Sequence, residues 1–195
     1  MTLAQIAQPG AEPVSLEEAK AHLRVDGYSE DALIDALIGA ARAHLENVTN
    51  RALVQTKYRL DLPGWPVGGV ITLPRPPLQA VTAIQYVDDG GELRTLASDQ
   101  YQVTTPSGPC AQRGTVRPAY GVSWPSLRPQ TNAVQVSFTA GYAACPKPLR
   151  AALLMLLAHL YESREAAAVG SIASVETPFG VRALLAPYVS REVLA

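Results

Sequence analysis

Charged residues and cysteines are scarce in this sequence. Charged residues make up 17% of its 195 residues, against 48% hydrophobic residues, a balance that excludes general disorder. Cys110 and Cys145 stand apart from each other and from any histidine cluster, so the sequence predicts neither a disulfide framework nor a structural zinc site. This cysteine usage fits a reducing cytoplasm. The net charge of -1 also lacks the basic excess of a chain whose main task is to bind bare nucleic acid.

Targeting segments and nucleotide-binding motifs are missing as well. Residues 1–13 contain no basic region followed by an apolar stretch, so we expect no secretion signal. The fully apolar run, residues 151–158, is far shorter than the roughly 18 residues of a membrane span, so we expect no membrane partner. The patterns GxxxxGK[ST], GxGxxG and GxSxG do not occur, which leaves no visible machinery for nucleotide hydrolysis or acyl transfer.

The residues that could carry catalysis or hold a metal have simpler structural explanations. His159 and Glu162 share a helical face, but a metal site there would need ligands from further helices. Asp88 and Asp89 precede two glycines, where aspartate favours a turn. The sequence therefore predicts no catalytic residue, no metal, no cofactor and no enzyme activity.

A weak nucleic-acid signal lies further along the chain. Arg113 and Arg117 lie close in sequence to Tyr120 and Trp124, as in a platform that stacks single-stranded bases. The surrounding loops are rich in proline. Solvated arginines and a packing tryptophan are therefore the favoured interpretation.

The densest apolar segment, residues 146–168, is the centre of the predicted fold. Its leucines repeat at three- and four-residue spacing, as on one face of a helix. They are Leu149, Leu153, Leu156, Leu157 and Leu160. Because every residue from 151 to 158 is apolar, the helix should have neighbours on all sides. The favoured prediction places this helix in the core of one domain. The alternative prediction places part of it at an interface between subunits.

Two helices are predicted before this segment. Ser15 and Glu18 have the spacing of a capping box, so the first helix should begin at Ser15 and end near Leu23. Ser29 is expected to cap the second helix, and Asn50 should end it in a left-handed conformation.

Between residues 55 and 140 the apolar pattern changes to a period of two, which predicts strands. Their expected positions are 57–62, 70–73, 81–87, 92–96, 101–104, 114–117 and 133–139, with a hairpin turn at 88–91. The predicted fold class is therefore α+β, a helical bundle from the N- and C-terminal helices with an inserted, mainly antiparallel β module. The expected divisions are 1–54 for the N-terminal helices, 55–140 for the β insertion, 141–168 for the central helix, and 169–195 for a linker and a C-terminal arm.

The C-terminal segment, residues 181–195, is amphipathic but short. Val181, Leu184 and Leu185 form one helical face before Pro187, and Tyr188 follows as an aromatic anchor. A helix of this length is marginal alone, so we expect it to be weakly ordered until it docks onto something. That partner could be another protein or the chain's own bundle.

Several segments together resemble the head–tail connector (adaptor) proteins of tailed phages, including related adaptors of gene transfer agents and prophages. The segments occur in the same order in that family. They read VSLEEAKAHLRVD, EDALIDALIGAARAHLENVTNRAL, LPRPPLQAVTAIQYVDDGGEL, SFTAGYA followed by PLRAALLMLLAHLYESRE, and ALLAPY. The resemblance covers nearly the whole chain. The long β insertion departs from the smallest members of the family.

The resemblance implies a non-enzymatic subunit of a virion or phage-like particle, made in the host cytoplasm. Such adaptors form a ring, usually of twelve copies, beneath the portal protein at the capsid vertex. The ring joins the capsid to a tail-side stopper or tail terminator protein, and double-stranded DNA passes through it without sequence specificity. The resemblance also implies that the C-terminal segment reaches the portal. The docking residues would be Val181, Arg182, Leu184, Leu185 and Tyr188. A small soluble enzyme or ligand-binding domain without a recognisable motif is the alternative function class.

Overall fold

The computed structural model describes residues 1–7, 10–163 and 178–190, and the chain divides into two compact units. Residues 1–10 and 55–142 belong to a β unit, whereas residues 11–54 and 143–195 belong to a helical unit. The predicted α+β class is confirmed. Residues 169–177, the first part of the predicted linker, lie outside the described residues. Within the described ranges, no helix is both long and apolar enough to cross a membrane.

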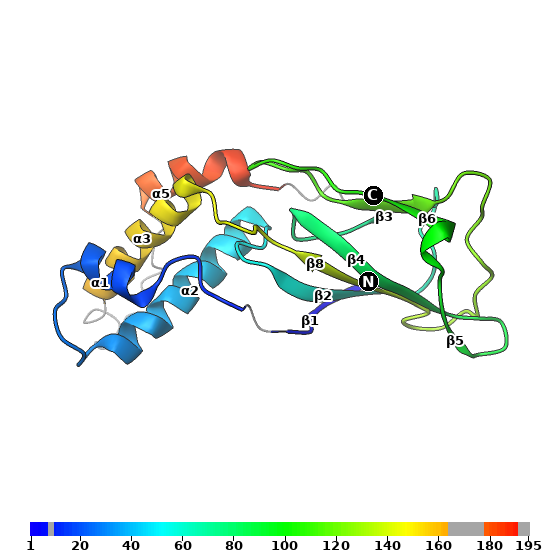
Figure 1. Cartoon of the computed structure of the whole chain (residues 1–195), viewed down its shortest axis with the longest axis horizontal. Helices are drawn as coiled ribbons and strands as arrows, with labels where there is room; N and C mark the ends of the chain where they lie inside the picture. Colours follow the sequence, from blue (N-terminus) through cyan, green and yellow to red (C-terminus); the bar gives the residue numbers. More distant parts are fainter. Residues whose placement is uncertain (8–9, 164–177, 191–195) are drawn as a thin grey trace. The chain divides into compact units, whose positions relative to one another are not determined.

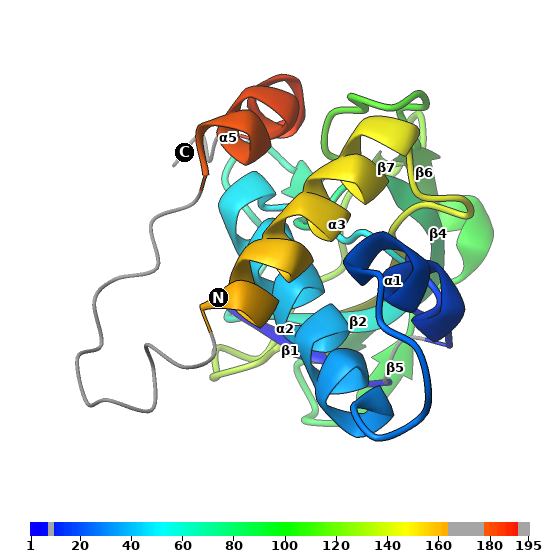
Figure 2. The ribbon, with the colours of Figure 1, turned by 90° about the vertical axis from the view of Figure 1, so that its left-hand side faces the viewer.

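The helical unit is built around one helix. Its elements are α1 (Leu16–Leu23), α2 (Asp31–Thr49), α3 (Lys147–Glu162), α5 (Phe179–Leu185) and the 3-10 turn η2 (Ala186–Tyr188). Figure 2 shows α3 in front of α2, with α1 and α5 at its two sides. Each of these helices contacts α3. The segment with the densest leucines is thus the centre of the unit.

The ends of α1 and α2 follow the predicted signals in part. The hydroxyl of Ser15 accepts a hydrogen bond from the backbone N–H of Glu18 at 3.2 Å, which confirms the predicted cap of α1. Asn50 ends α2 with a φ of 54°, the predicted left-handed conformation. The prediction that Ser29 caps α2 is wrong. The N-cap position is Glu30, which makes no side-chain capping bond, and Asp31 forms an ion pair with Lys20 at 2.6 Å.

The β unit contains two antiparallel sheets (Figure 1). The larger sheet has the order β1-β2-β8-β4-β5, and the smaller has the order β3-β7-β6. The bounds are β1 (Thr2–Gln5), β2 (Thr56–Leu62), β3 (Ile71–Thr72), β4 (Leu78–Val87), β5 (Leu93–Thr95), β6 (Tyr101–Thr104), β7 (Thr115–Pro118) and β8 (Val134–Ala140), with the 3-10 turn η1 (Ser98–Gln100) before β6. The predicted hairpin is confirmed as β4 and β5.

The central strand of the larger sheet has the clearest alternation. Side chains of β8 alternate between buried and half-buried, as expected for a strand with one face in a core. On the buried face Phe138 stacks on Tyr58 of β2, with ring centroids 5.7 Å apart. Strand β1, which the sequence did not predict, pairs with β2 from Thr2 opposite Asp61 to Gln5 opposite Tyr58. Residues 1–10 therefore belong to the β unit rather than to the helices.

Candidate functional site

Four of the five leucines singled out on α3 lie in the core of the helical unit. The buried members are Leu149, Leu153, Leu156 and Leu157, and Leu160 is half-buried. These side chains pack inside the chain's own helical unit. The prediction of a core helix holds for this inward face, and the surface available for a neighbour has to be sought on the other side of α3.

That other side is apolar as well, although it is open. Ala151 is exposed, and Met155, one helical turn later, keeps 39% of its surface accessible. The expectation that α3 is enclosed on all sides is therefore wrong for the single chain. The reason is the number of neighbours, since α1, α2 and α5 contact α3 but leave Ala151 exposed, and α5 meets Met155 at Gly180 while leaving 39% of its surface accessible.

The C-terminal segment packs on its own helical unit as far as the structure describes it. Val181, Leu185 and Tyr188 are buried, Leu184 is half-buried and Arg182 is exposed. The expectation that this segment is weakly ordered is therefore wrong for residues 181–190. Its apolar face, too short to be stable alone, is stabilised by burial against α3. Residues 191–195 lie outside the described part of the chain.

Two hydrogen bonds hold the segment beside the end of α2. The Nε–H of Arg51, a side chain with only 2% of its surface exposed, donates to the backbone carbonyl of Tyr188. The backbone N–H of Ser190 donates to the carbonyl of Thr49 at 2.8 Å. A buried guanidinium needs such acceptors, because an unpaired buried charge is costly. The segment is thereby positioned by polar contacts in addition to its apolar face.

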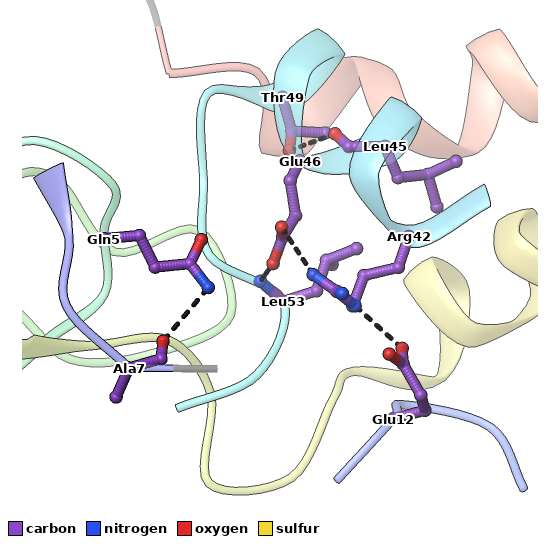
Figure 3. Close-up of polar contacts among 8 residues, drawn as sticks. All are labelled: Gln5, Ala7, Glu12, Arg42, Leu45, Glu46, Thr49 and Leu53. Atoms are coloured by element: carbon purple, nitrogen blue, oxygen red, sulfur yellow. Dashed lines mark hydrogen bonds and ion pairs between the residues drawn. The ribbon is translucent and has the colours of Figure 1, made fainter. Parts of the chain in front are cut away.

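A charged network fixes the residues that follow α2 (Figure 3). Arg42 bridges Glu12 at 2.7 Å and Glu46 at 3.0 Å, and the second oxygen of Glu46 accepts from the backbone N–H of Leu53 at 2.8 Å. Burial lowers the pKa of Arg42, but its hydrogen bonds and attraction to Glu12 and Glu46 together outweigh this effect and raise the pKa above its ordinary value. The network stabilises the turn that carries Arg51.

A protruding apolar surface lies where α3 and α5 meet. Phe179 is 87% exposed at the start of α5. The next residue is Gly180, and a Cβ atom built there would come within 2.7 Å of the methyl carbon of Met155. Met155 therefore lies directly against the backbone of α5 at Gly180, the residue that follows Phe179 in sequence. Ala183, one turn after Phe179, is also exposed.

The outward face of α2, here called the flat face, carries mostly small apolar side chains. Its exposed residues recur at three- and four-residue spacing and are mostly small: Ala32, Ala36, Ala40, Ala43 and Asn47. Leu33 and Val48 lie at one flank, 40% and 41% exposed. Asp35 is the only charged residue among the exposed side chains of α2. This face was not predicted from the sequence, because its alanines add little to a hydrophobic pattern.

The carboxylates of the β4–β5 turn have structural partners. Asp88 accepts from Arg94 and from the backbone N–H of Glu92, each at 2.9 Å, and Asp89 accepts from the hydroxyl of Ser126. The hydrogen bond from Arg94, followed by that from Glu92, lowers the pKa of Asp88. These contacts confirm the turn interpretation of both aspartates.

Trp124 packs within the β unit. Its ring stacks on Trp65 with centroids 4.4 Å apart, and its indole N–H donates to the carbonyl of Gly69 at 3.0 Å. A ring that is stacked and hydrogen-bonded within the protein presents less surface to a base than a free platform would. The packing interpretation is confirmed for Trp124, whereas the ring of Tyr120 is fully exposed.

The described residues include no group of three or more His, Cys, Asp or Glu side chains that could hold a metal ion. Cys110 is an exposed free thiol, and Cys145 is partly buried. Burial raises the pKa of the Cys145 thiol to about 12, which suits a structural cysteine rather than a nucleophile.

Comparisons with known proteins found a matching family model and similar solved structures. Residues 13–86 match the family model described as phage gp6-like head-tail connector protein. A chain in the neck of an empty GTA particle computed with C6 symmetry is 27% identical, with a TM-score of 0.81. Chains in the virion of a native gene transfer agent (GTA) particle and in the neck of a native GTA particle computed with C12 symmetry are each 28% identical, with a TM-score of 0.78.

Each of these structural matches covers 100% of this chain and 98% of the other. No curated protein sequence matches the chain significantly. The matched family is one of structural connectors and not of enzymes. The sequence match over residues 13–86, together with the shared fold at 27–28% identity over the full length, confirms the predicted resemblance: this chain is similar to the phage gp6-like head–tail connector proteins and to chains of gene transfer agent necks.

Proposed function

We propose that this chain is a head–tail connector subunit in the neck of a phage or gene transfer agent particle. The observation that carries the proposal is the match of the whole fold, over 100% of the chain, to chains of gene transfer agent necks. The match includes both units of the chain rather than one common module. The absence of a metal cluster among the described residues is consistent with a structural task.

The proposed arrangement is a ring of identical subunits beneath the portal protein. The C6 and C12 symmetries of the similar necks support a ring, usually of twelve copies in this family. The ring joins the capsid to a stopper or tail terminator protein on the tail side. Double-stranded DNA passes through it, and passage without sequence specificity requires no contacts to base edges.

The C-terminal segment remains the proposed portal-docking element. Its buried residues anchor it to the helical unit, and its exposed residues are available to the portal. Val181, Leu185 and Tyr188 hold the segment on the helical unit, because their side chains are buried. Arg182 is exposed and Leu184 is half-exposed, so these two would contact the portal. The segment would then act as a positioned surface rather than as a free arm.

Native mass spectrometry of the chain co-expressed with the portal protein of the same genome tests the function. We expect a complex with several copies of this chain for each portal ring. Arg182→Glu should weaken binding to the portal without changing the melting temperature of the free chain. A chain that stays monomeric and does not bind the portal would contradict the proposed function. Unchanged binding by Arg182→Glu would contradict the docking role of α5.

A further inference from the structure

Two apolar faces of the helical unit are left open by the described residues. The first, the protruding face, consists of Ala151, Met155, Phe179 and Ala183. The second, the flat face, is the outward side of α2, with Ala36, Ala40 and Ala43 at its centre. Outward positions of a solvated helix normally carry charged side chains. An apolar stripe on each of two faces therefore indicates that both are covered in the working assembly.

The two faces differ in the size of their side chains. The protruding face offers two large side chains, since Phe179 is 87% exposed and Met155, which contacts the following residue Gly180, is 39% exposed. The flat face has alanines in its middle, and the partly exposed Leu33 and Val48 add apolar area at its flank. Small residues let another surface approach closely, and large residues fill the space between helical turns. Aromatic and methionine side chains are also enriched at the centres of protein interfaces.

The two faces point away from each other within the helical unit. Helices α2 and α3 contact each other, with Ile38 and Leu45 of α2 and Leu153 of α3 among the fully buried side chains of the unit. The outward faces of both helices therefore lie on different sides. One chain cannot bring its own two faces together, but two copies can.

We infer that the protruding face of one copy packs against the flat face of α2 in a neighbouring copy. The inference rests on the proposed ring. A ring of identical subunits uses a heterologous contact, in which each subunit presents two different, complementary surfaces. The similar neck chains were computed with cyclic symmetry, and this chain has two such surfaces on different sides of one unit. The partner is therefore a second copy of this chain.

Cysteine crosslinking within the portal-bound complex tests this contact. The variant combines Phe179→Cys and Ala40→Cys with Cys110→Ser, which removes the exposed native thiol. Cys145 can stay, because its raised pKa and partial burial keep it unreactive. A short bis-maleimide reagent should produce a ladder of multimers on a denaturing gel. Each variant with only one of the two new cysteines should run as a monomer on the denaturing gel, because position 179 of one copy meets position 40, not position 179, of the next copy.

The matched control places a cysteine at Tyr28 instead of Phe179. Tyr28 is also an aromatic residue with 87% exposure, but it lies between α1 and α2, outside both faces. The Tyr28→Cys and Ala40→Cys pair should give no ladder. Two outcomes would show that the inferred contact is wrong. One is a crosslink from Phe179→Cys to the portal, and the other is the absence of a ladder for the Phe179→Cys and Ala40→Cys pair in complexes that contain several copies. Neither outcome would contradict the proposed function.

Charge substitution gives an independent measure. Phe179→Asp should reduce the number of copies that assemble on the portal by about tenfold or more, as expected for the loss of a central aromatic contact. Tyr28→Asp should assemble like the unmodified chain. Both variants should keep the melting temperature of the free subunit, because both side chains are exposed. Normal assembly of Phe179→Asp would overturn the inference, whereas failure of the unmodified chain to assemble would instead reject the ring itself.

Discussion

Arg51 and Tyr188 are 137 positions apart in the sequence, and the guanidinium of Arg51 donates a hydrogen bond to the backbone carbonyl of Tyr188. Arg51 follows directly after α2, whereas Tyr188 ends η2. The bond therefore connects the N-terminal and C-terminal parts of the helical unit. Because it uses a backbone acceptor, it positions the segment independently of the side chain at position 188.

Replacement of Arg51 by alanine should destabilise the chain by about 2 kcal/mol or more, because a charge-assisted hydrogen bond in a buried setting is lost. Urea unfolding followed by circular dichroism measures this change. Arg182→Ala is the control. Its side chain is exposed on α5, and we expect a change within about 0.5 kcal/mol. Equal effects of the two substitutions would show that the Arg51 bond contributes little.

Deletion of residues 181–195 should lower the melting temperature clearly. The sequence alone favoured an unchanged melting temperature, but Val181, Leu185 and Tyr188 are buried. Their removal exposes the side of α3 that α5 covers. Differential scanning calorimetry of the truncated chain, compared with a chain that lacks only residues 191–195, tests this. An unchanged melting temperature in both would contradict the packing of α5 on α3.

Leu153→Ala and Leu157→Ala should each cost about 2–5 kcal/mol, since both side chains are fully buried. Met155 lies between them in sequence but on the open side of α3. Met155→Ala should therefore cost less than about 1 kcal/mol in the free subunit. Chemical denaturation of the three variants gives the comparison. Similar losses for all three would mean that α3 has no open side.

Thiol labelling should distinguish the two cysteines. Cys110 is exposed and should react readily with a maleimide. Cys145 should remain unlabelled in the folded chain, because its pKa is raised to about 12, first by burial. Mass spectrometry after labelling, with and without denaturant, locates the modification. Rapid labelling of Cys145 in the folded state would contradict its burial.

The β4–β5 turn should respond to acid. The hydrogen bond from Arg94 lowers the pKa of Asp88 below its ordinary value of 3.8. A carboxyl group with a depressed folded-state pKa stabilises the fold above its unfolded pKa, and this contribution disappears as the pH falls through the folded-state pKa. NMR titration should therefore show Asp88 titrating below 3.8. Arg94→Gln should raise the pKa of Asp88. An unchanged pKa of Asp88 in this variant would argue against the ion pair between Arg94 and Asp88.

Local signals were predicted best. The cap at Ser15, the left-handed Asn50 and the β4–β5 hairpin depend on residues close in sequence, so their chemistry is visible in the sequence itself. The change from helical to strand periodicity also located the β unit. Strand β1 was missed because it has only four residues and depends on pairing with β2.

Surfaces were predicted less well than elements. The leucine spacing on α3 identified the core, but periodicity does not tell how many neighbours a helix has. Met155 was therefore expected to be enclosed and is partly open. Conversely, the short apolar face of α5 was expected to wait for a partner, yet Val181 and Leu185 pack on α3. The flat face of α2 could be recognised only from the solvent exposure of each side chain in the structure.

The pairing of Thr56 with Ala140 has a consequence for how such a chain can evolve. These residues lie at the start of β2 and the end of β8, so the stretch that follows α2 enters the larger sheet and leaves it at neighbouring positions, whereas β1 joins the same sheet from the N-terminus. The stretch between them can lengthen or shorten at little entropic cost, because its ends are already held together. Recombination could therefore exchange residues 57–139 as a module, provided that the new module also offers β1 an edge to pair with.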